Sequence, residues 1–194
     1  TSSVTQSLDF IHSQGVMHRD IKPHNVLINH PRRTLKIVDF GLAEFYFPEK
    51  DYSSKVASLY YKAPEVLLGS TRYDYRIDLW AAGMILAGMV TLFLTQVFRR
   101  TPFVQGNDPL DQVYRLSKLL GTEEMLKYVK AHEDQLSEAQ ELKKEMRIAL
   151  ENPGTRKFPK TDLNEFVNKE NADFVSEEVL DLIRSLLTLD PEQR

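Results

Sequence analysis

The sequence predicts a mostly α-helical domain with a small β element, and three observations lead to that prediction. Apolar residues recur at helical spacing through most of the chain, whereas only two short runs favour β structure. The composition, with 42% hydrophobic and 27% charged residues over 194 positions, is that of an ordinary globular protein with enough chain for a core. A long segment without any period, residues 39–64, separates the β runs from the helical remainder.

The first third of the chain contains one expected helix and both β runs. Residues 4–14 are expected to be helical because Val4, Leu8 and Ile11 recur at i, i+4 and i+7, and Gly15 marks the end of that helix. Residues 26–29 and 35–38 favour strands and are separated by a turn-like segment, which predicts a small hairpin. The following loop is unusually long for a compact domain, and such loops are usually functional.

The rest of the chain reads as helical. Helices are expected from Asp78 onward and near residues 108–120, 122–132, 137–150 and 176–189. Between Leu79 and Phe98 there are 20 residues without a formal charge, which is the length of a membrane span. Glycine, threonine and glutamine interrupt this stretch, so we interpret it as a buried central helix, with a membrane span as the alternative.

Charge and cysteine content exclude several classes of function. The formal net charge is −3, from 25 Lys and Arg against 28 Asp and Glu, so the chain has no global basic field. We therefore expect neither nucleic acid nor membrane as a partner. The absence of cysteine removes disulfides, thiolate zinc sites and thiol nucleophiles together, and it favours a reducing compartment.

The two ends of the sequence suggest part of a larger domain. Thr1 lies in what reads as the middle of an amphipathic helix, and the chain stops at Arg194 just after an apolar helical run. We therefore treat residues 1–194 as a fragment.

Three motifs carry the chemistry, in a fixed order. Residues 18–25, His-Arg-Asp-Ile-Lys-Pro-His-Asn, are followed by Asp-Phe-Gly at 39–41 and Ala-Pro-Glu at 63–65. They match the catalytic loop, the metal-binding motif and the segment end of protein kinases. A single tripeptide means little, but three motifs in this order and separation are specific.

The chemistry of phosphoryl transfer explains these residue types. Asp20 is placed to orient a substrate hydroxyl and take its proton, and Lys22 is placed to neutralise γ-phosphate charge. Asn25 and Asp39 offer oxygen ligands to Mg²⁺, so ATP and Mg²⁺ are the expected cofactors. We expect Lys22, Asn25 and Asp39 to bind the nucleotide together with its metal.

Each of these residues has an ordinary structural interpretation when taken singly. Aspartate and asparagine are common in turns and helix caps, and an isolated lysine is usually a solvated surface residue. His18 is expected to be a packed structural residue, because no metal-ligand spacing surrounds it. Arg19 is a candidate to face an anion from the segment that follows Asp39.

The motif surroundings resemble the catalytic (alpha) subunits of casein kinase II. The resemblance rests on segments 22–25, 41–46, 56–58, 61–65, 73–80 and 119–124. Cyclin-dependent and mitogen-activated kinases are similar in the same core, but they usually have Arg at the position of Lys62. The resemblance implies a protein kinase-like fold in which residues 1–194 form only the C-terminal lobe. The glycine-rich loop and the ATP-positioning lysine would then lie in an N-terminal lobe that is absent from this sequence.

The resemblance also implies roles for further residues. Asp78 would begin the buried helix that braces the catalytic loop, with Trp80 and Gly83 packed around it. Glu65 would pair with Arg194 and anchor the activation segment. Other positions implied by the resemblance are a structural Gly41 in the Asp-Phe-Gly motif and two lysines, Lys55 and Lys62, that would recognise acidic residues after the target Ser or Thr.

Three departures from the family pattern stand out. Phe40 replaces a tryptophan, a substitution that other kinases carry. Leu59 stands where the family usually has an arginine in the substrate groove, which weakens the expected selectivity. Around residues 91–96 the chain holds several residues more than the pattern, either as an insertion or as a gene-model error.

The resemblance finally implies an activity and partners. The expected function is a Ser/Thr protein kinase acting near acidic residues, in the cytoplasm and nucleus, with protein substrates of that kind as partners. A regulatory beta subunit would bind through the absent lobe. The alternative is a catalytically inactive pseudokinase or truncated interaction module. A glycine-rich loop and a lysine-bearing strand upstream of Thr1 would favour the enzyme.

Overall fold

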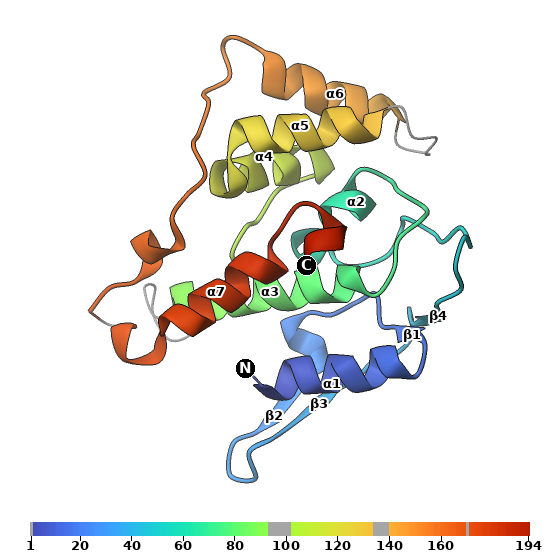
Figure 1. The fold of residues 1–194 in the computed structure, drawn as a ribbon, viewed down its shortest axis with the longest axis vertical. Coiled ribbons are helices and arrows are strands. Elements are labelled where there is room, and N and C mark those ends of the chain that lie inside the picture. Colours follow the sequence, from blue (N-terminus) through green and yellow to red (C-terminus); the bar gives the residue numbers. More distant parts are fainter. Residues whose placement is uncertain (1, 93–101, 134–139, 170) are drawn as a thin grey trace.

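The computed structural model describes residues 2–92, 102–133, 140–169 and 171–194. Helices dominate it, and two small antiparallel strand pairs lie at one end, together with the N-terminal helix α1 (Figure 1). Helices α4, α5 and α6 form a separate group at the other end, and α3 and α7 lie between the two groups (Figure 1). The mostly helical prediction with a small β element is therefore confirmed.

The N-terminal third folds as the sequence indicates. Helix α1 (Ser2–Ser13) ends before Gly15, which has a φ of 75° that favours glycine. Strands β2 (Val26–Asn29) and β3 (Thr34–Ile37) form the expected hairpin, with Val26 opposite Ile37. A second strand pair, which the sequence did not reveal, begins directly after Gly15. There β1 (Val16–Met17) pairs with β4 (Glu44–Phe45).

The long segment from residue 39 to 63 is mostly irregular, as predicted. It contains β4 and a single 3₁₀ turn, η2 (Leu59–Tyr61), before the short helix α2 (Pro64–Leu67) begins. Tyr52 holds the middle of this segment in place, because its buried hydroxyl donates to the carbonyl of Phe45 and accepts from the amide of Phe47. The segment is thus held to the domain although it has little regular structure.

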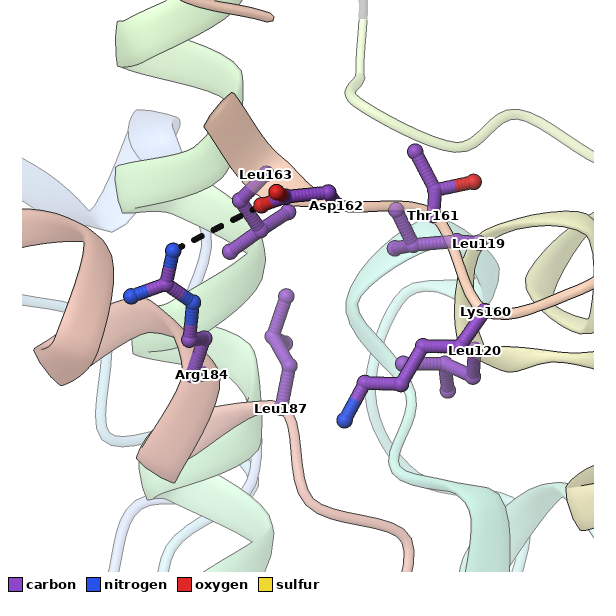
Figure 2. A pocket seen from close by; sticks show the side chains of 8 residues that line it. All are labelled: Leu119, Leu120, Lys160, Thr161, Asp162, Leu163, Arg184 and Leu187. Carbon is purple, nitrogen blue, oxygen red and sulfur yellow. Dashed lines mark ion pairs between the residues drawn. The ribbon is translucent and has the colours of Figure 1, made fainter. Parts of the chain in front are cut away.

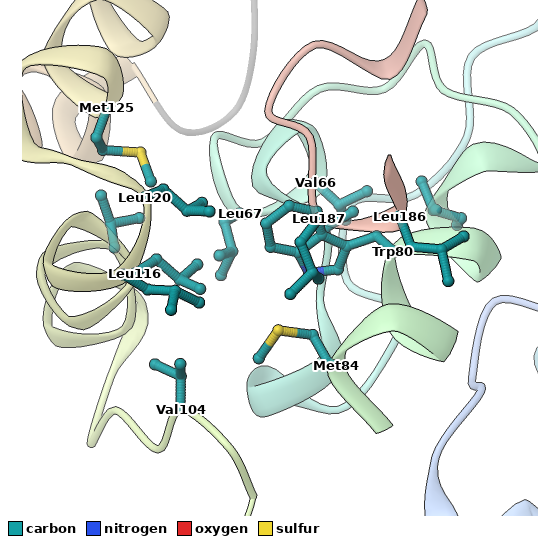
Figure 3. Packing of buried hydrophobic residues seen from close by; sticks show 14 of the residues in the cluster. Val66, Leu67, Trp80, Met84, Val104, Leu116, Leu120, Met125, Leu186 and Leu187 are labelled. Carbon is teal, nitrogen blue, oxygen red and sulfur yellow. The ribbon is translucent and has the colours of Figure 1, made fainter. Parts of the chain in front are cut away.

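Helix α3 (Arg76–Leu92) and helix α7 (Glu177–Leu186) form the centre of the core. Trp80 of α3 is fully buried among apolar side chains of several elements, including Leu186 and Leu187 (Figure 3). A Cβ at Gly83 would lie 2.8 Å from the Cβ of Leu186, so glycine is what lets these helices approach. Burial confirms the expectation that Trp80 and Gly83 pack around the start of this helix.

The third group consists of helix α4 (Pro109–Leu120), helix α5 (Thr122–Glu133) and helix α6 (Gln140–Glu151). Asp108 caps α4, since its side chain accepts the amide N–H of Asp111 at 2.8 Å. Short 3₁₀ turns follow at η3 (Leu163–Phe166), η4 (Ala172–Phe174) and, beyond α7, η5 (Pro191–Gln193), and η1 (Pro23–Asn25) precedes β2. The helices predicted near 108–120, 122–132 and 176–189 are present, and the one predicted near 137–150 is present from Gln140, because residues 137–139 lie outside the described residues.

The long uncharged stretch is helical and mostly buried as far as the structure describes it. Helix α3 accounts for it up to Leu92, and Met89, at 51%, is the most exposed apolar side chain between residues 76 and 90. Among the described residues, no helix combines the length and apolar character that crossing a membrane requires. Residues 93–98, and with them most of the apparent insertion at 91–96, lie outside the described residues.

Candidate active site

The catalytic-loop motif gathers polar side chains around the carboxylate of Asp20. Lys22 Nζ lies 2.6 Å from Asp20 Oδ2, and Asn25 Nδ2 donates to the same oxygen at 3.2 Å. Asn25 Nδ2 also donates to the backbone carbonyl of Asp20 at 2.8 Å, which fixes the amide orientation. Ser58 Oγ lies 3.3 Å from the other oxygen, Asp20 Oδ1. Asp20 is 7% exposed, so these contacts hold a nearly buried carboxylate in one place.

The β2–β3 hairpin brings Asp39 to the same site. The amide of Val38 donates to the carbonyl of Asn25 at 3.0 Å, directly beyond the last strand pair. His18 is fully buried and joins both segments, since its Nε2 lies 3.1 Å from the carbonyl of Val38. Its ring also contacts Phe40 edge to face at 4.8 Å. His18 is therefore the packed residue that the sequence predicted, and it ties the two motifs together.

Two oxygen atoms of the site are suited to a hard cation. Asn25 uses its nitrogen for Asp20, which leaves Oδ1 as an acceptor, and Asp39 uses Oδ1 to accept from the amide of Gly41 at 3.3 Å. Oxygen donors of this kind, completed by phosphate oxygens, are what Mg²⁺ prefers. Within the described residues no group of three or more His, Asp or Glu could hold a metal alone. Asn25 and Asp39 offer oxygen donors of the type that Mg²⁺ binds together with phosphate oxygens.

The backbone at the site is strained. Arg19 and Asp39 both have a φ of 65°, in the left-handed region that non-glycine residues rarely occupy. Each residue of this kind costs about 1–3 kcal/mol and persists only where its surroundings hold it. A Cβ at Gly41 would lie 3.2 Å from Asp39 Oδ1, so a larger residue there would have to shift this carboxylate slightly.

Asp78 holds the catalytic loop from the start of α3. Its Oδ2 accepts the amide of His18 and its Oδ1 accepts the amide of Arg19, both at 2.8 Å. His12 Nε2 lies 3.0 Å from Oδ2, so α1 joins the same buried carboxylate. Asp78 is 1% exposed, and these three contacts compensate for its removal from water.

We expect Asp78→Ala to loosen the catalytic loop selectively. The substitution leaves two buried amides without an acceptor, and a hydrogen bond to a charged group contributes about 1.5–3 kcal/mol. Amide hydrogen exchange at His18 and Arg19 should therefore accelerate by about 10–100-fold. Asp108→Ala, which removes the cap of α4, should leave exchange at these two amides unchanged. Equal exchange at both amides in Asp78→Ala and in the unsubstituted protein would contradict the assignment.

Arg19 contacts the segment after Asp39, as the sequence suggested. Its Nε donates to the carbonyl of Leu42 at 2.6 Å, and its Nη2 lies 3.8 Å from the Glu44 carboxylate. Its Nη1 donates to the hydroxyl of Tyr73 at 3.2 Å. Burial raises the pKa of Tyr73, partly offset by this arginine. The guanidinium thus links the catalytic loop to the activation segment through a carboxylate that the chain itself supplies.

The ion pair expected between Glu65 and Arg194 is present. Arg194 Nη1 and Nη2 donate to the two carboxylate oxygens at 2.6 and 2.7 Å, in a bidentate arrangement. The Arg194 side chain is fully buried, and its guanidinium lies 5.0 Å from the centre of the Trp80 ring. The pair anchors α2, and therefore the end of the activation segment, to the core.

The expected substrate-groove residues lie on the segment that leads to α2. Lys55 is exposed, and Lys62 is half-buried with its Nζ donating to the carbonyl of Ser54 at 3.1 Å. Burial lowers the pKa of Lys62. Leu59 is partly buried and packs against the core. Lys62 is therefore engaged with its own loop in this structure, and Leu59 has a packing role that the sequence did not indicate.

Sequence reasoning missed two residues at the site. Ser58 contacts Asp20 from a distant part of the chain, and His12 contacts Asp78 from α1. Ser58 follows Ala57, whose φ of 61° marks a strained turn beside the site. Ser58 lies in a segment that the sequence analysis used only for the resemblance, and His12 lies in none of its motifs, so only the folded chain reveals these contacts. The family model of the protein kinase domain matches residues 1–194.

Proposed function

The chain belongs to the protein kinase family, and on that premise we propose that it carries the transfer site of a serine/threonine kinase similar to the catalytic subunits of casein kinase II. The single observation that supports this best is the environment of Asp20. A nearly buried carboxylate is held by Lys22, Asn25 and Ser58, and the hairpin bonds the backbone just before Asp39 to Asn25. Phosphoryl transfer depends on such positioning more than on covalent chemistry.

The roles of the residues follow from these contacts. Asp20 orients the hydroxyl of a substrate serine or threonine and takes its proton as that oxygen bonds to the γ-phosphorus and the bond to the bridging oxygen breaks. Lys22, 2.6 Å from Asp20, neutralises charge on the moving phosphoryl group. Asn25 and Asp39 would hold Mg²⁺, which when bound neutralises phosphate charge. The contact with Ser58 holds the carboxylate of Asp20 in the orientation in which it meets the substrate hydroxyl.

We further propose that residues 1–194 correspond to the C-terminal lobe of the kinase domain. The sequence contains the catalytic loop and the Asp-Phe-Gly motif but neither a glycine-rich loop motif nor the Val-Ala-Ile-Lys type of strand motif. The phosphate-covering elements would then come from an N-terminal lobe outside these residues. The isolated chain should accordingly show little transfer activity, whereas the full-length protein should be active.

The test compares matched substrate peptides. The full-length protein, Mg²⁺ and γ-labelled ATP are incubated with three acidic peptides that differ only in carrying Ser, Thr or Tyr at the target position. We expect label on the Ser and Thr peptides and none on the Tyr peptide, and loss of label when downstream acidic residues become neutral. Absence of transfer to all three peptides would contradict the proposed activity and favour an inactive interaction module.

Selectivity for acidic substrates should depend on Leu59. In the proposed groove an arginine at this position would add one exposed charge contact, and exposed pairs contribute about 0–1 kcal/mol. Leu59→Arg should therefore lower KM for the most acidic peptide by up to about fivefold at low salt, with less effect at high salt. Leu59→Gln, which removes the same apolar side chain without adding charge, is the matched control. An unchanged dependence of KM on peptide charge in Leu59→Arg would show that this residue only packs.

A further inference from the structure

A group of unpaired cations lies away from the active site, on the segment before η3 and on α4. It consists of Lys118, Arg156, Lys157 and Lys160, which we call the basic cluster. All four are exposed, and among the described residues none of them has a carboxylate within ion-pair distance. Lys157 donates only to the carbonyl of Leu150. Four uncompensated positive charges in a chain of net charge −3 form a local field suited to an acidic partner.

Aromatic rings hold two of these cations in place. Lys118 Nζ lies 4.6 Å from the centre of the Tyr114 ring and 5.4 Å from that of Phe158. The Arg156 guanidinium lies 5.2 Å from the same Phe158 ring. The backbone of Phe158 is itself fixed, because it exchanges hydrogen bonds with Thr122 at 2.9 and 3.0 Å. The basic cluster is therefore attached to an ordered part of the fold.

An apolar pocket of about 300 Å³ adjoins the basic cluster and shares Lys160 with it. Its lining includes four leucines from three segments: Leu119, Leu120, Leu163 and Leu187. Figure 2 shows Leu187 and Arg184 on one side of the pocket, the α4 leucines on the other, and Lys160 reaching between them. Arg184 is already bound by carboxylates, including Asp162 at 3.6 Å and Asp181 at 2.6 Å. Lys160 is thus the available cation at the rim.

We propose that this pocket and the basic cluster form a docking site for an acidic peptide segment that carries one leucine-sized or methionine-sized side chain. The apolar side chain would enter the pocket beside Leu187, and carboxylates on either side of it would meet Lys160, Lys118 and Arg156. A pocket of this volume is at the small end of ligand sites, which suits a single anchoring side chain. Nucleic acid fits less well, because the cations occupy the aromatic faces on which bases would stack. The proposal concerns binding alone and goes beyond the proposed phosphoryl transfer.

The test is direct binding of synthetic peptides to the full-length protein without ATP, measured by fluorescence anisotropy. The probe is a labelled peptide with a single leucine flanked by glutamates, compared with a leucine-to-alanine peptide and a glutamate-to-glutamine peptide. We expect saturable binding that each change weakens by about tenfold, since the first removes the buried anchor and the second removes the charges. Raising the salt concentration should weaken binding of the acidic peptide and leave the neutral one unaffected.

Variants of the protein locate the site. Lys160→Ala should weaken binding by up to about fivefold, and adding Lys118→Ala should weaken it further. Lys144→Ala, at an exposed lysine on α6, is the matched control and should leave binding unchanged. Methyl NMR tests the pocket without any substitution in it. The methyl signals of Leu163 and Leu187 should shift when the acidic leucine peptide is added.

Three results would overturn the proposal. The first is the absence of saturable binding by the acidic leucine peptide at millimolar concentration. The second is equal affinity for the leucine and alanine peptides, which would show that the pocket does not take part in binding. The third is binding of a single-stranded oligonucleotide of matched charge that is as tight as binding of the acidic leucine peptide and also depends on Lys160. That result would show that the basic cluster binds polyanions in general. None of these results bears on transfer of phosphate, so failure here is distinct from failure of the proposed function.

Discussion

Asp20→Asn in the full-length protein should lower kcat by about 10²–10⁴-fold, the contribution typical of a positioned acid or base. Asparagine keeps the size of the side chain and one acceptor oxygen for Lys22 and Asn25, but it cannot take the proton of the attacking hydroxyl. The affinity for ATP should change little, because Asp20 faces Lys22 and Ser58 and is not one of the two proposed metal ligands. The measurement is steady-state kinetics with an acidic serine peptide, combined with a nucleotide-binding titration.

Asp39→Asn should behave differently, and this difference separates the two aspartates. Removing a negatively charged oxygen ligand should weaken binding of the metal with its nucleotide and abolish most of the turnover. Asp9→Asn, at an exposed position on α1, serves as the matched control and should alter neither quantity. Equal loss of ATP affinity in Asp20→Asn and Asp39→Asn would contradict the division of roles.

Arg194→Ala should produce the largest loss of stability among the substitutions considered. It leaves the carboxylate of Glu65, which is 6% exposed, without its bidentate partner. Removing one partner of a buried pair typically lowers the free energy of unfolding by about 3–5 kcal/mol. Urea unfolding followed by circular dichroism measures the change. The carbonyls of Thr188 and Leu189 also lose a donor, which adds to the loss.

Two control experiments distinguish the loss of stability caused by breaking the buried ion pair from the loss that removal of any arginine would cause. Arg72→Ala breaks an exposed pair with Asp51 and should change the free energy of unfolding by only about 0–1 kcal/mol. Glu65→Leu combined with Arg194→Met should be less destabilising than Arg194→Ala, because no uncompensated charge remains. A loss in Arg194→Ala no larger than that in Arg72→Ala would show that the pair does not anchor the activation segment.

The sequence predicted those parts of the molecule whose determinants are local. The β2–β3 hairpin follows from two β-favouring runs around a turn, and the helices follow from apolar spacing, with ends correct to within a few residues. The motif residues also come together as expected, because the hairpin alone is enough to set Asn25 beside Val38 and hence beside Asp39.

What the sequence did not show depends on contacts between distant segments. The two-residue strands β1 and β4 are too short to leave a periodic signal, and they form only because the chain after Asp39 returns to α1. Ser58 and His12 likewise acquire their partners only in the folded chain. The resemblance implied that Lys62 recognises acidic substrates, and the contact that the fold gives its Nζ with the carbonyl of Ser54 was not predicted.

The most direct measurement of the central claim is the position of a metal ion in the full-length protein. Crystals grown with Mn²⁺ and a non-hydrolysable ATP analogue would place the ion by its anomalous scattering. We expect a peak within about 2.0–2.5 Å of Asn25 Oδ1 and of an Asp39 carboxylate oxygen, with the γ-phosphate facing Asp20. A nucleotide-bound metal that contacts neither Asn25 nor Asp39 would contradict the account.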